Sequence, residues 1–368
     1  MSSVDLGGRQ GPAASPEVDE LLGRIGWGAF DPDSVSSRPG RNEAWLGTTT
    51  SGRRVFVKHL RGGAADTLAR LRRLLEFQEF AGRIPAGELR YPRLAGHDER
   101  ARLVVFEAVD DARSGAELMV DESFDDVLAH SVGRAIGRLH TTGHEGVELH
   151  RGVPLLPSLE LLRGISQGMF DQSSFGQLSA LSLMQQDSEL ADGINALLVR
   201  EEAAEKVPSH CDLRVDQFLV RDSAVFIADW EEFRLADAAR DIGSFAGEWL
   251  YRSVLDIVTN RGDDGLVDLE LSHDLIVTRG AEKLERLRPR IENFCRGYRE
   301  VRPDTDPELW ERATAFAGWH ALDRLIASAA RSARLSGIER AAAGVGRNAL
   351  LHPARFAPAL GLEVTVTA

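Results

Sequence analysis

Alternating hydrophobic and polar positions recur through residues 18–110 and predict antiparallel strands there. We expect a hairpin from EAWLGTTT and RRVFVKHL, which flank the turn Ser51-Gly52, and a second hairpin from YPRLAGHDER and ARLVVFEAV. Between the hairpins, residues 66–80 place leucine and phenylalanine at helical spacing, with Asp66 as the expected N-cap. This part of the chain is therefore predicted to be a small sheet interrupted by one helix.

A polar linker at residues 110–115 separates this part from one with a helical pattern. Amphipathic helices are expected from FDDVLAHSVGRAIGRLHTTG, from ELADGINALLVREEAAEKV and over most of residues 266–351, whereas QFLVRDSAVFIADW predicts a strand, a turn and a strand. Residues 1–17 are rich in Gly, Pro, Ser and Ala and have little to bury, which predicts a mobile leader. We expect a leader at 1–17, an N-terminal lobe at 18–110 and a larger, mainly helical lobe at 111–368.

Composition narrows the class of protein. The chain has 368 residues, of which 43% are hydrophobic, enough for two lobes around a large core. Its net charge of −13 argues against a nucleic-acid partner and would attract a cationic substrate, although solubility alone also explains it. Cys211 and Cys295 give neither a disulfide framework nor a zinc-ligand spacing, and no run of about 18 apolar residues occurs. We therefore expect a cytoplasmic protein that binds neither nucleic acid nor membrane.

The strongest chemical signal is SHCDLRVDQFLV at residues 209–220, followed by Asp229 in FIADWEE. A short hairpin would bring the carboxylates of Asp212 and Asp229 together, although seventeen residues separate them. Such a pair suits phosphoryl transfer, in which one acid orients the attacking hydroxyl and another holds a metal ion on the phosphate oxygens. His210 and Asp212 alone would indicate only a capped turn, so the spaced second acid carries the argument.

These motifs resemble the HGDxxxxN loop and the IDWE segment of the aminoglycoside phosphotransferase and choline kinase superfamily. The resemblance covers roughly residues 25–350 and implies an α+β, bilobal protein-kinase-like fold, with a five-stranded antiparallel N-lobe that includes one strand before EAWLGTTT. It implies an ATP- and Mg²⁺-dependent phosphotransferase. Asp212 would be the catalytic base, His210 would brace the loop by hydrogen bonding, and Asp229 would bind the metal.

The same resemblance assigns a nucleotide-binding lysine. Lys58 in VFVKHL stands where the family has the strand lysine that holds the nucleotide's phosphates. Its apolar neighbours suggest half burial, which requires an acidic partner. Glu76 on the following helix is the expected partner, Glu79 is the alternative, and an exposed salt-bridged face is the structural alternative to both.

Two further segments are assigned by position. In the segment at residues 38–43, Gly40 and Asn42 resemble the family's loop over the phosphates, although an ordinary Pro-Gly turn explains this segment as well. Glu107 and Val109 stand where the inter-lobe hinge offers backbone groups to adenine. The resemblance also implies that Asp241 braces the catalytic loop, and we interpret His140 as a packed structural residue.

The sequence departs from the family pattern at three positions. Gln217 replaces the Asn that binds the second metal; it offers a carbonyl oxygen one methylene further out. Cys211 replaces the Gly of HGD, and we favour a packed thiol over a reactive one. For Arg214 two roles stay open, namely stabilising the transferred phosphate and pairing with Asp216.

The acceptor is less determined than the nucleotide chemistry. Acids of the helical lobe could meet a cationic acceptor or belong to solvated helix faces: Asp263, Asp264, Glu282, Glu285, Asp304, Asp306 and Glu308. The segments GRNEAW, TTTSGRRVFVK and HCDLRVDQFLV resemble stand-alone kinase-like proteins of class V lanthipeptide and thioamitide pathways, which implies a precursor peptide as substrate and a separate lyase as partner. A small-molecule kinase acting on a cationic acceptor and a nucleotide-binding pseudokinase are the alternatives.

Overall fold

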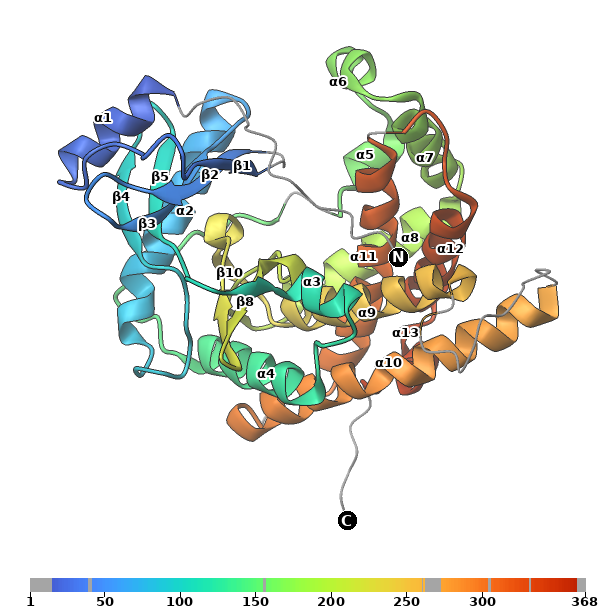
Figure 1. The fold of residues 1–368 in the computed structure, drawn as a ribbon. Coiled ribbons are helices and arrows are strands. Elements are labelled where there is room, and N and C mark those ends of the chain that lie inside the picture. Colours follow the sequence, from blue (N-terminus) through green and yellow to red (C-terminus); the bar gives the residue numbers. More distant parts are fainter. Residues whose placement is uncertain are drawn as a thin grey trace, which may run out of the picture.

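The structure is a computed structural model and describes residues 15–38, 42–154, 157–259, 261, 273–303, 306–330 and 332–362. It has the predicted α+β architecture, with a small sheet-based lobe and a larger helical lobe (Figure 1). Within the described ranges, no helix combines the length and the apolar composition needed to cross a membrane.

Among the described residues of the N-lobe, five antiparallel strands pair in the order β1-β2-β3-β5-β4. Their bounds are β1 Ser36–Arg38, β2 Glu43–Thr48, β3 Arg54–His59, β4 Leu94–Asp98 and β5 Leu103–Glu107. Both predicted hairpins and the additional strand before them are confirmed.

Two helices cover the sheet. Helix α1, Pro16–Arg24, was not predicted; it packs its Val18, Leu21 and Leu22 against Val55 and Val57 of β3. Helix α2, Ala64–Phe80, lies on the other face, where Leu71 contacts Leu60 and Val104. The expected N-cap was wrong, because the helix begins one turn earlier with Gly63 at the cap; Asp66 lies in its first turn and pairs with Arg70 at 3.2 Å.

The C-lobe is mainly helical, as predicted. Its helices are α3 Gly115–Val120, α4 Asp126–Thr141, α5 Leu159–Arg163, α6 Gln167–Gln172, α7 Phe175–Gln185, α8 Ser188–Ala203, α9 Ala239–Leu255, α10 His273–Val301, α11 Leu309–Ala329, α12 Gly337–Leu351 and α13 Pro353–Phe356. Short strands lie among them: β6 Arg113–Ser114, β7 Lys206–Ser209, β8 Phe218–Arg221, β9 Ala224–Ile227 and β10 Arg234–Asp237. Short 3₁₀ turns complete the fold: η1 Ala81–Arg83, η2 Val215–Gln217, η3 Trp230–Glu232, η4 Asp256–Val258 and η5 Pro358–Leu360.

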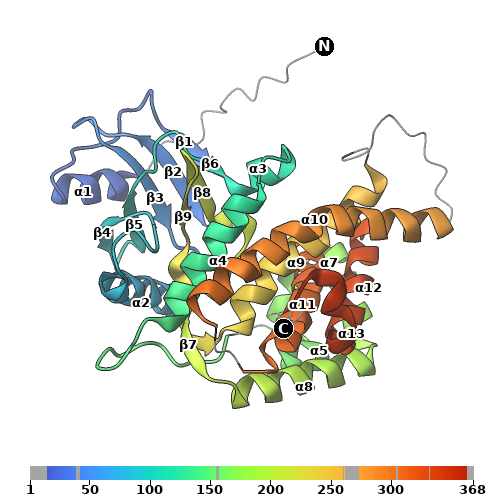
Figure 2. The same cartoon turned by 90° about the horizontal axis from the view of Figure 1, so that it is seen from below.

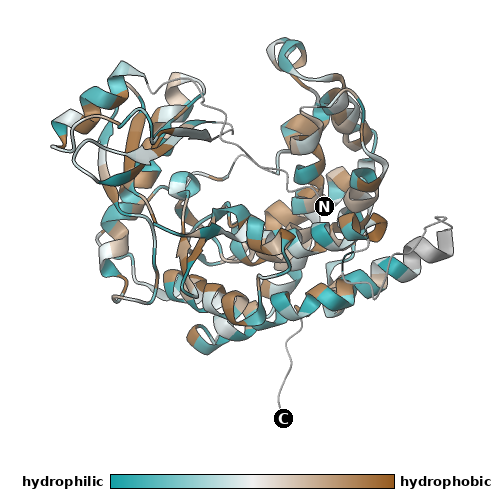
Figure 3. Ribbon diagram, viewed as in Figure 1, coloured by the Kyte–Doolittle hydropathy of each residue, from teal (hydrophilic) through white to brown (hydrophobic). Residues whose placement is uncertain are grey.

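Helices α4 and α10 run side by side in the C-lobe (Figures 1 and 2). Glycines permit the close approach, because a Cβ at Gly133 would lie 2.0 Å from the carbonyl oxygen of Phe294, and one at Gly297 would lie 2.2 Å from that of His130. Buried hydrophobic residues of α4 and α10 share one core with residues of α9 and α11, and Figure 3 colours hydrophobic positions brown along the ribbon. The main core also includes Phe77 and Phe80 of α2, so this helix packs on both lobes.

Candidate active site

The catalytic loop, residues 209–217, lies between β7 and β8 and is held by one buried carboxylate. Asp241, in the first turn of α9, accepts hydrogen bonds from the backbone N–H groups of His210 at 2.8 Å and Cys211 at 2.7 Å. Its Oδ2 also contacts Nε2 of His140 at 3.1 Å, and the other ring nitrogen of His140 contacts the hydroxyl of Tyr298 at 2.9 Å. The expected bracing role of Asp241 and the packed role of His140 fit this geometry.

His210 fixes the loop from the inside. Its Nε2 lies 2.9 Å from the carbonyl oxygen of Ala228, and its Nδ1 accepts the backbone N–H of Asp212 at 3.2 Å. Burial lowers the pKa of His210, although the nearby carboxylate of Asp241 opposes that shift. A neutral ring can donate at one nitrogen and accept at the other, which is the arrangement that these two bonds need.

Cys211 adopts a backbone conformation that explains why the family has glycine there. Its φ is +64°, in the left-handed region that favours residues without a Cβ. Burial raises the pKa of the Cys211 thiol far above its usual range, so it stays protonated. These facts support a packed thiol over a reactive one.

The hairpin β8–β9 brings the second carboxylate to the loop. Asp222 and Ser223 form its two-residue turn with φ of 49° and 63°, both positive as a type I′ turn requires. The backbone N–H of Ala228 donates to the carbonyl oxygen of Gln217 at 2.9 Å, which ties the hairpin's end to the catalytic loop. Asp229 follows in a left-handed conformation, with φ of 66°.

Asp212 is poised to titrate near neutrality. Burial raises the pKa of Asp212 to about 7; the charge of Arg214 opposes this shift, and that of Asp229 adds to it. The side chain nevertheless keeps 37% of its surface exposed, so an acceptor can reach it. Arg214 Nε lies 3.0 Å from Asp212 Oδ1, and its Nη1 lies 3.6 Å from Asp216 Oδ2, so Arg214 pairs with Asp216 as considered and also contacts Asp212.

Lys58 joins the two lobes, but not through the expected partner. Its Nζ lies 2.7 Å from Asp229 Oδ1 and also pairs with Glu231 Oε1. Burial opposes the charged form, yet these two carboxylates raise the pKa of Lys58 overall. The predicted Lys58–Glu76 pair is wrong, because Glu76 Oε2 instead accepts the backbone N–H of His150 at 2.9 Å.

Two residues that sequence reasoning missed complete this network. Glu231 Oε2 pairs with Arg70 Nη1 of α2 at 2.9 Å, and both side chains are buried. Asn42 lies between them: its Nδ2 donates to Glu231 Oε1 at 3.2 Å, and its Oδ1 accepts from Arg70 Nη1 at 3.3 Å and from the Arg61 backbone N–H at 2.9 Å. The first acid after Asp229 in FIADWEE was the available signal for Glu231, whereas the sequence carried no such signal for Arg70.

The hinge residues lie at the end of β5. The backbone N–H of Glu107 donates to the carbonyl oxygen of Arg93, and the backbone N–H of Ala108 donates to the carbonyl oxygen of Arg54. Within the described residues, the backbone N–H of Val109 makes no hydrogen bond. Val109 can therefore donate to a ligand. Gly40, the other residue expected to meet the phosphates, lies outside the described residues.

Comparison with known proteins identifies the family. Residues 38–270 match the family model described as phosphotransferase enzyme family, more than half of the chain. The chain belongs to the phosphotransferase enzyme family. It is an ATP-dependent phosphotransferase that acts on hydroxyl groups.

Solved structures share the fold of this phosphotransferase at low sequence identity. A spectinomycin phosphotransferase in complex with ADP and spectinomycin is 14% identical, with a TM-score of 0.52, covering 94% of this chain and 100% of that one. An amicoumacin kinase in complex with AMP-PNP, Ca²⁺ and Ami is 17% identical, with a TM-score of 0.51 and coverages of 88% and 90%. Choline kinase LicA from Streptococcus pneumoniae is 12% identical, with a TM-score of 0.50 and coverages of 86% and 92%. No curated protein matches the chain by sequence.

The phosphotransferase has oxygen donors that suit a divalent metal. Asp229 is partly exposed at 26% of its side-chain surface, and no hydrogen bond engages the Gln217 side-chain amide in the described part of the chain. A carboxylate and an amide oxygen are hard ligands, and Mg²⁺ commonly takes only one or two protein ligands beside phosphate oxygens. The described residues contain no cluster of three or more His, Cys, Asp or Glu side chains able to hold a metal.

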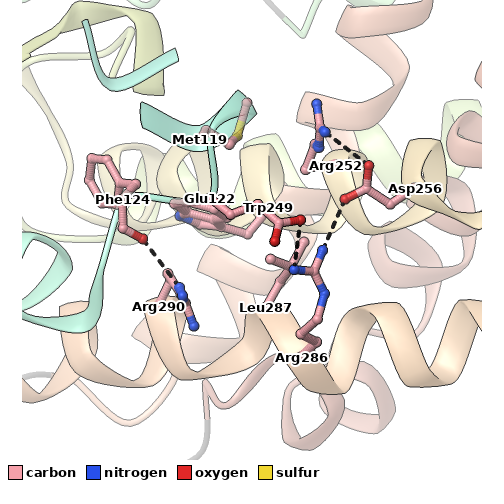
Figure 4. A pocket seen from close by; sticks show the side chains of 9 residues that line it. All are labelled: Met119, Glu122, Phe124, Trp249, Arg252, Asp256, Arg286, Leu287 and Arg290. Atoms are coloured by element: carbon pink, nitrogen blue, oxygen red, sulfur yellow. Dashed lines mark hydrogen bonds and ion pairs between the residues drawn. The ribbon is translucent and has the colours of Figure 1, made fainter. Parts of the chain in front are cut away.

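Neither Asp229 nor Gln217 lines the small pocket shown in Figure 4. It is lined by Met119, Glu122, Phe124, Trp249, Arg252, Asp256, Arg286, Leu287 and Arg290. Its volume of about 20 Å³ is far below the several hundred Å³ typical of ligand pockets. The arginines that line it are paired, as with Arg286 Nη1 and Glu122 Oε1 at 3.0 Å, so we do not assign the nucleotide there.

The acids considered for the acceptor divide into three groups, one of which is the exposed Glu282 of α10 alone. Asp263, Asp264 and Asp304 lie outside the described residues. Three others pair with arginines of this chain: Glu285 with Arg288, Asp306 with Arg312, and Glu308 with Arg200, at 2.8 to 3.0 Å. These pairs favour the interpretation as solvated or packed helix faces.

Proposed function

We propose that this protein is a Mg²⁺-dependent O-phosphotransferase in which Asp212 is the general base and Asp229 and Gln217 hold the metal. The observation that carries the proposal is the contact of Lys58 with Asp229, 2.7 Å across the two lobes, directly beside the braced loop that bears Asp212. Mg²⁺, when bound, would neutralise charge on the phosphate oxygens.

The roles of the chain's own groups follow from their chemistry. With its raised pKa, Asp212 is a stronger base than an ordinary carboxylate and can accept the proton of an acceptor hydroxyl near neutral pH. Arg214, beside it, offers positive charge where phosphate charge develops. Lys58 would hold nucleotide phosphates, while Asn42 and Gly40 would belong to the loop over them. Glu107 and Val109 would offer backbone groups to adenine.

For the acceptor, we propose a Ser or Thr hydroxyl of a ribosomally made precursor peptide, with a separate lyase that later eliminates the phosphate. The resemblance of the segments around Asn42, Lys58 and Asp212 to lanthipeptide-pathway kinases supports this choice. Such a reaction takes place in the cytoplasm, where ATP and newly made peptides meet.

A small-molecule hydroxyl is the second candidate. The solved structures with this fold include a spectinomycin phosphotransferase and a choline kinase, whose named substrates are small cations. The net charge of −13 would attract such a substrate. A nucleotide-binding pseudokinase is the third candidate, because Gln217 stands where the family has the Asn that binds the second metal.

Mass spectrometry separates these candidates. The protein would be incubated with ATP, Mg²⁺ and either Ser/Thr precursor peptides or a panel of aminoglycosides, with Asp212→Asn as the control. We expect phosphate on the peptides and a loss of about 10²–10⁴-fold in rate in the control. Phosphate on the aminoglycosides alone would favour the second candidate, and equal background turnover in both proteins would favour the pseudokinase.

A further inference from the structure

Helix α2 presents Arg70 and Arg73, and neither of its two glutamates, to the lysine network. Arg70, Arg73 and Phe77 lie at positions i, i+3 and i+7, which places them on one face of the helix. That face docks on η3: the ring of Phe77 stacks on Trp230 at 3.6 Å with the planes 3° apart, and Arg73 Nε donates to the Glu231 carbonyl oxygen at 2.6 Å. Helix α2 therefore holds the segment that follows Asp229 by three neighbouring side chains.

Helical geometry excludes Glu76 from this face. Successive residues of an α-helix are rotated by about 100°, so Glu76 points about 100° away from Phe77. Its carboxylate bonds to the backbone of His150 instead. Glu79 lies about 180° from Arg70 and points away as well. Neither glutamate of α2 can meet Lys58 while this face stays docked.

Glu231 is the acidic partner of Lys58 that α2 does not provide. One of its oxygens pairs with Lys58, and the other pairs with Arg70, so a single buried carboxylate bridges β3 and α2. Arg70 has no exposed side-chain surface, and Asp66 and Asn42 also contact its guanidinium. A carboxylate held at both oxygens has little freedom to move away from the lysine.

We propose that Glu231 positions Lys58 for the nucleotide and that Arg70 fixes Glu231 for this task. The inference rests on the proposed nucleotide-binding role of Lys58. The acid that orients the lysine would thus come from the segment carrying the metal ligand Asp229, and α2 would contribute the opposite charge. Lysine, metal ligand and helix α2 are then set by one continuous network rather than by a separate pair within the N-lobe.

Nucleotide affinity measured by calorimetry tests the proposal. We expect Glu231→Gln to weaken ATP binding by about tenfold, because Lys58 loses a charge-assisted partner. Glu231→Asp keeps the carboxylate and should bind ATP more tightly than Glu231→Gln. Glu76→Gln is the matched control on α2 and should bind ATP within about twofold of the wild type. Equal loss in Glu76→Gln and Glu231→Gln would overturn the proposal.

A double-mutant cycle separates positioning from a general structural effect. If Glu231 acts through Lys58, the variant Lys58→Met/Glu231→Gln should bind ATP as weakly as Lys58→Met alone. Additive losses would overturn the proposal. The role of Arg70 is tested with the double variant Arg70→Gln/Glu231→Gln, which removes both charges of the buried pair and so avoids leaving one of them unpaired. This double variant should bind ATP with the same affinity as Glu231→Gln. A further loss of affinity would contradict the role assigned to Arg70.

The proposed function and this inference can fail separately. A wild-type protein that binds ATP, together with a Glu231→Gln variant of unchanged affinity, overturns only the inference. A wild-type protein that does not bind ATP, or a Lys58→Met variant that binds it normally, overturns the nucleotide role of Lys58 and the inference with it.

Discussion

The catalytic loop and the lysine network lie side by side but are held in different ways. The loop is held mainly by backbone hydrogen bonds to one buried acid, Asp241, and to the ring of His210. The network around Lys58 consists of charged side chains from both lobes, with Glu231 at its centre. The first arrangement fixes a backbone shape, whereas the second depends on charges that a nucleotide and a metal would rearrange.

The comparison predicts its largest effect at Asp241. Asp241→Ala leaves two buried backbone N–H groups and His140 without their acceptor, so we expect the free energy of unfolding to fall by about 3–5 kcal/mol. Chemical denaturation measures this change. Asp192→Ala, at an exposed position of α8, is the matched control and should stay within about 0.5 kcal/mol of the wild type. A loss at Asp241 no larger than the control's would show that the loop is held in another way.

A smaller effect is expected in the pH dependence of activity. Asp212 must be ionised to act as a base, and its raised pKa of about 7 predicts that kcat/KM increases as the pH rises through about 7. The positive charge of Arg214 lowers this pKa, so Arg214→Met should move the midpoint upward by about one pH unit.

The control for that shift is Arg221→Met, in the exposed turn region of β8–β9, which should leave the midpoint unchanged. A midpoint that stays fixed, or moves downward, in Arg214→Met would contradict the electrostatic account of the loop.

The smallest effect is expected at Cys211. Because its φ of +64° suits glycine, Cys211→Gly should keep the free energy of unfolding within about 1 kcal/mol of the wild type. A β-branched side chain is strained at positive φ, so Cys211→Val should lower the free energy of unfolding by about 2 kcal/mol. Thermal unfolding of both variants measures the difference, and equal stability would argue against backbone strain as the reason for glycine in the family.

The two regions also differ in how far the sequence predicts them. The catalytic loop was predictable because its parts are local: Asp212 and His210 lie two residues apart, and one short hairpin carries the chain to Asp229. The hairpins of the N-lobe were predictable for the same reason, since alternation sets which side chains face α1 and which face α2.

The partner of Lys58 was not predictable from local pattern. Glu76 has the expected residue type on the expected helix, but the stacking of Phe77 on Trp230 fixes the rotation of α2 and turns Glu76 toward His150. That rotation depends on contacts between residues far apart in the sequence, such as Arg70 and Glu231, which are 161 positions apart. Helix α1 was missed because it has only nine residues, and a helix this short becomes stable only when its apolar face packs against the sheet.

The most direct test of the central claim is the affinity for ATP, measured by calorimetry with and without Mg²⁺ in the wild type, Lys58→Met and Asp229→Asn. If these residues form one nucleotide and metal site, Mg²⁺ should strengthen binding in the wild type, Asp229→Asn should abolish that Mg²⁺ effect, and Lys58→Met should weaken binding about tenfold or more. An Asp229→Asn variant that keeps the full Mg²⁺ effect, together with wild-type affinity in Lys58→Met, would contradict the account.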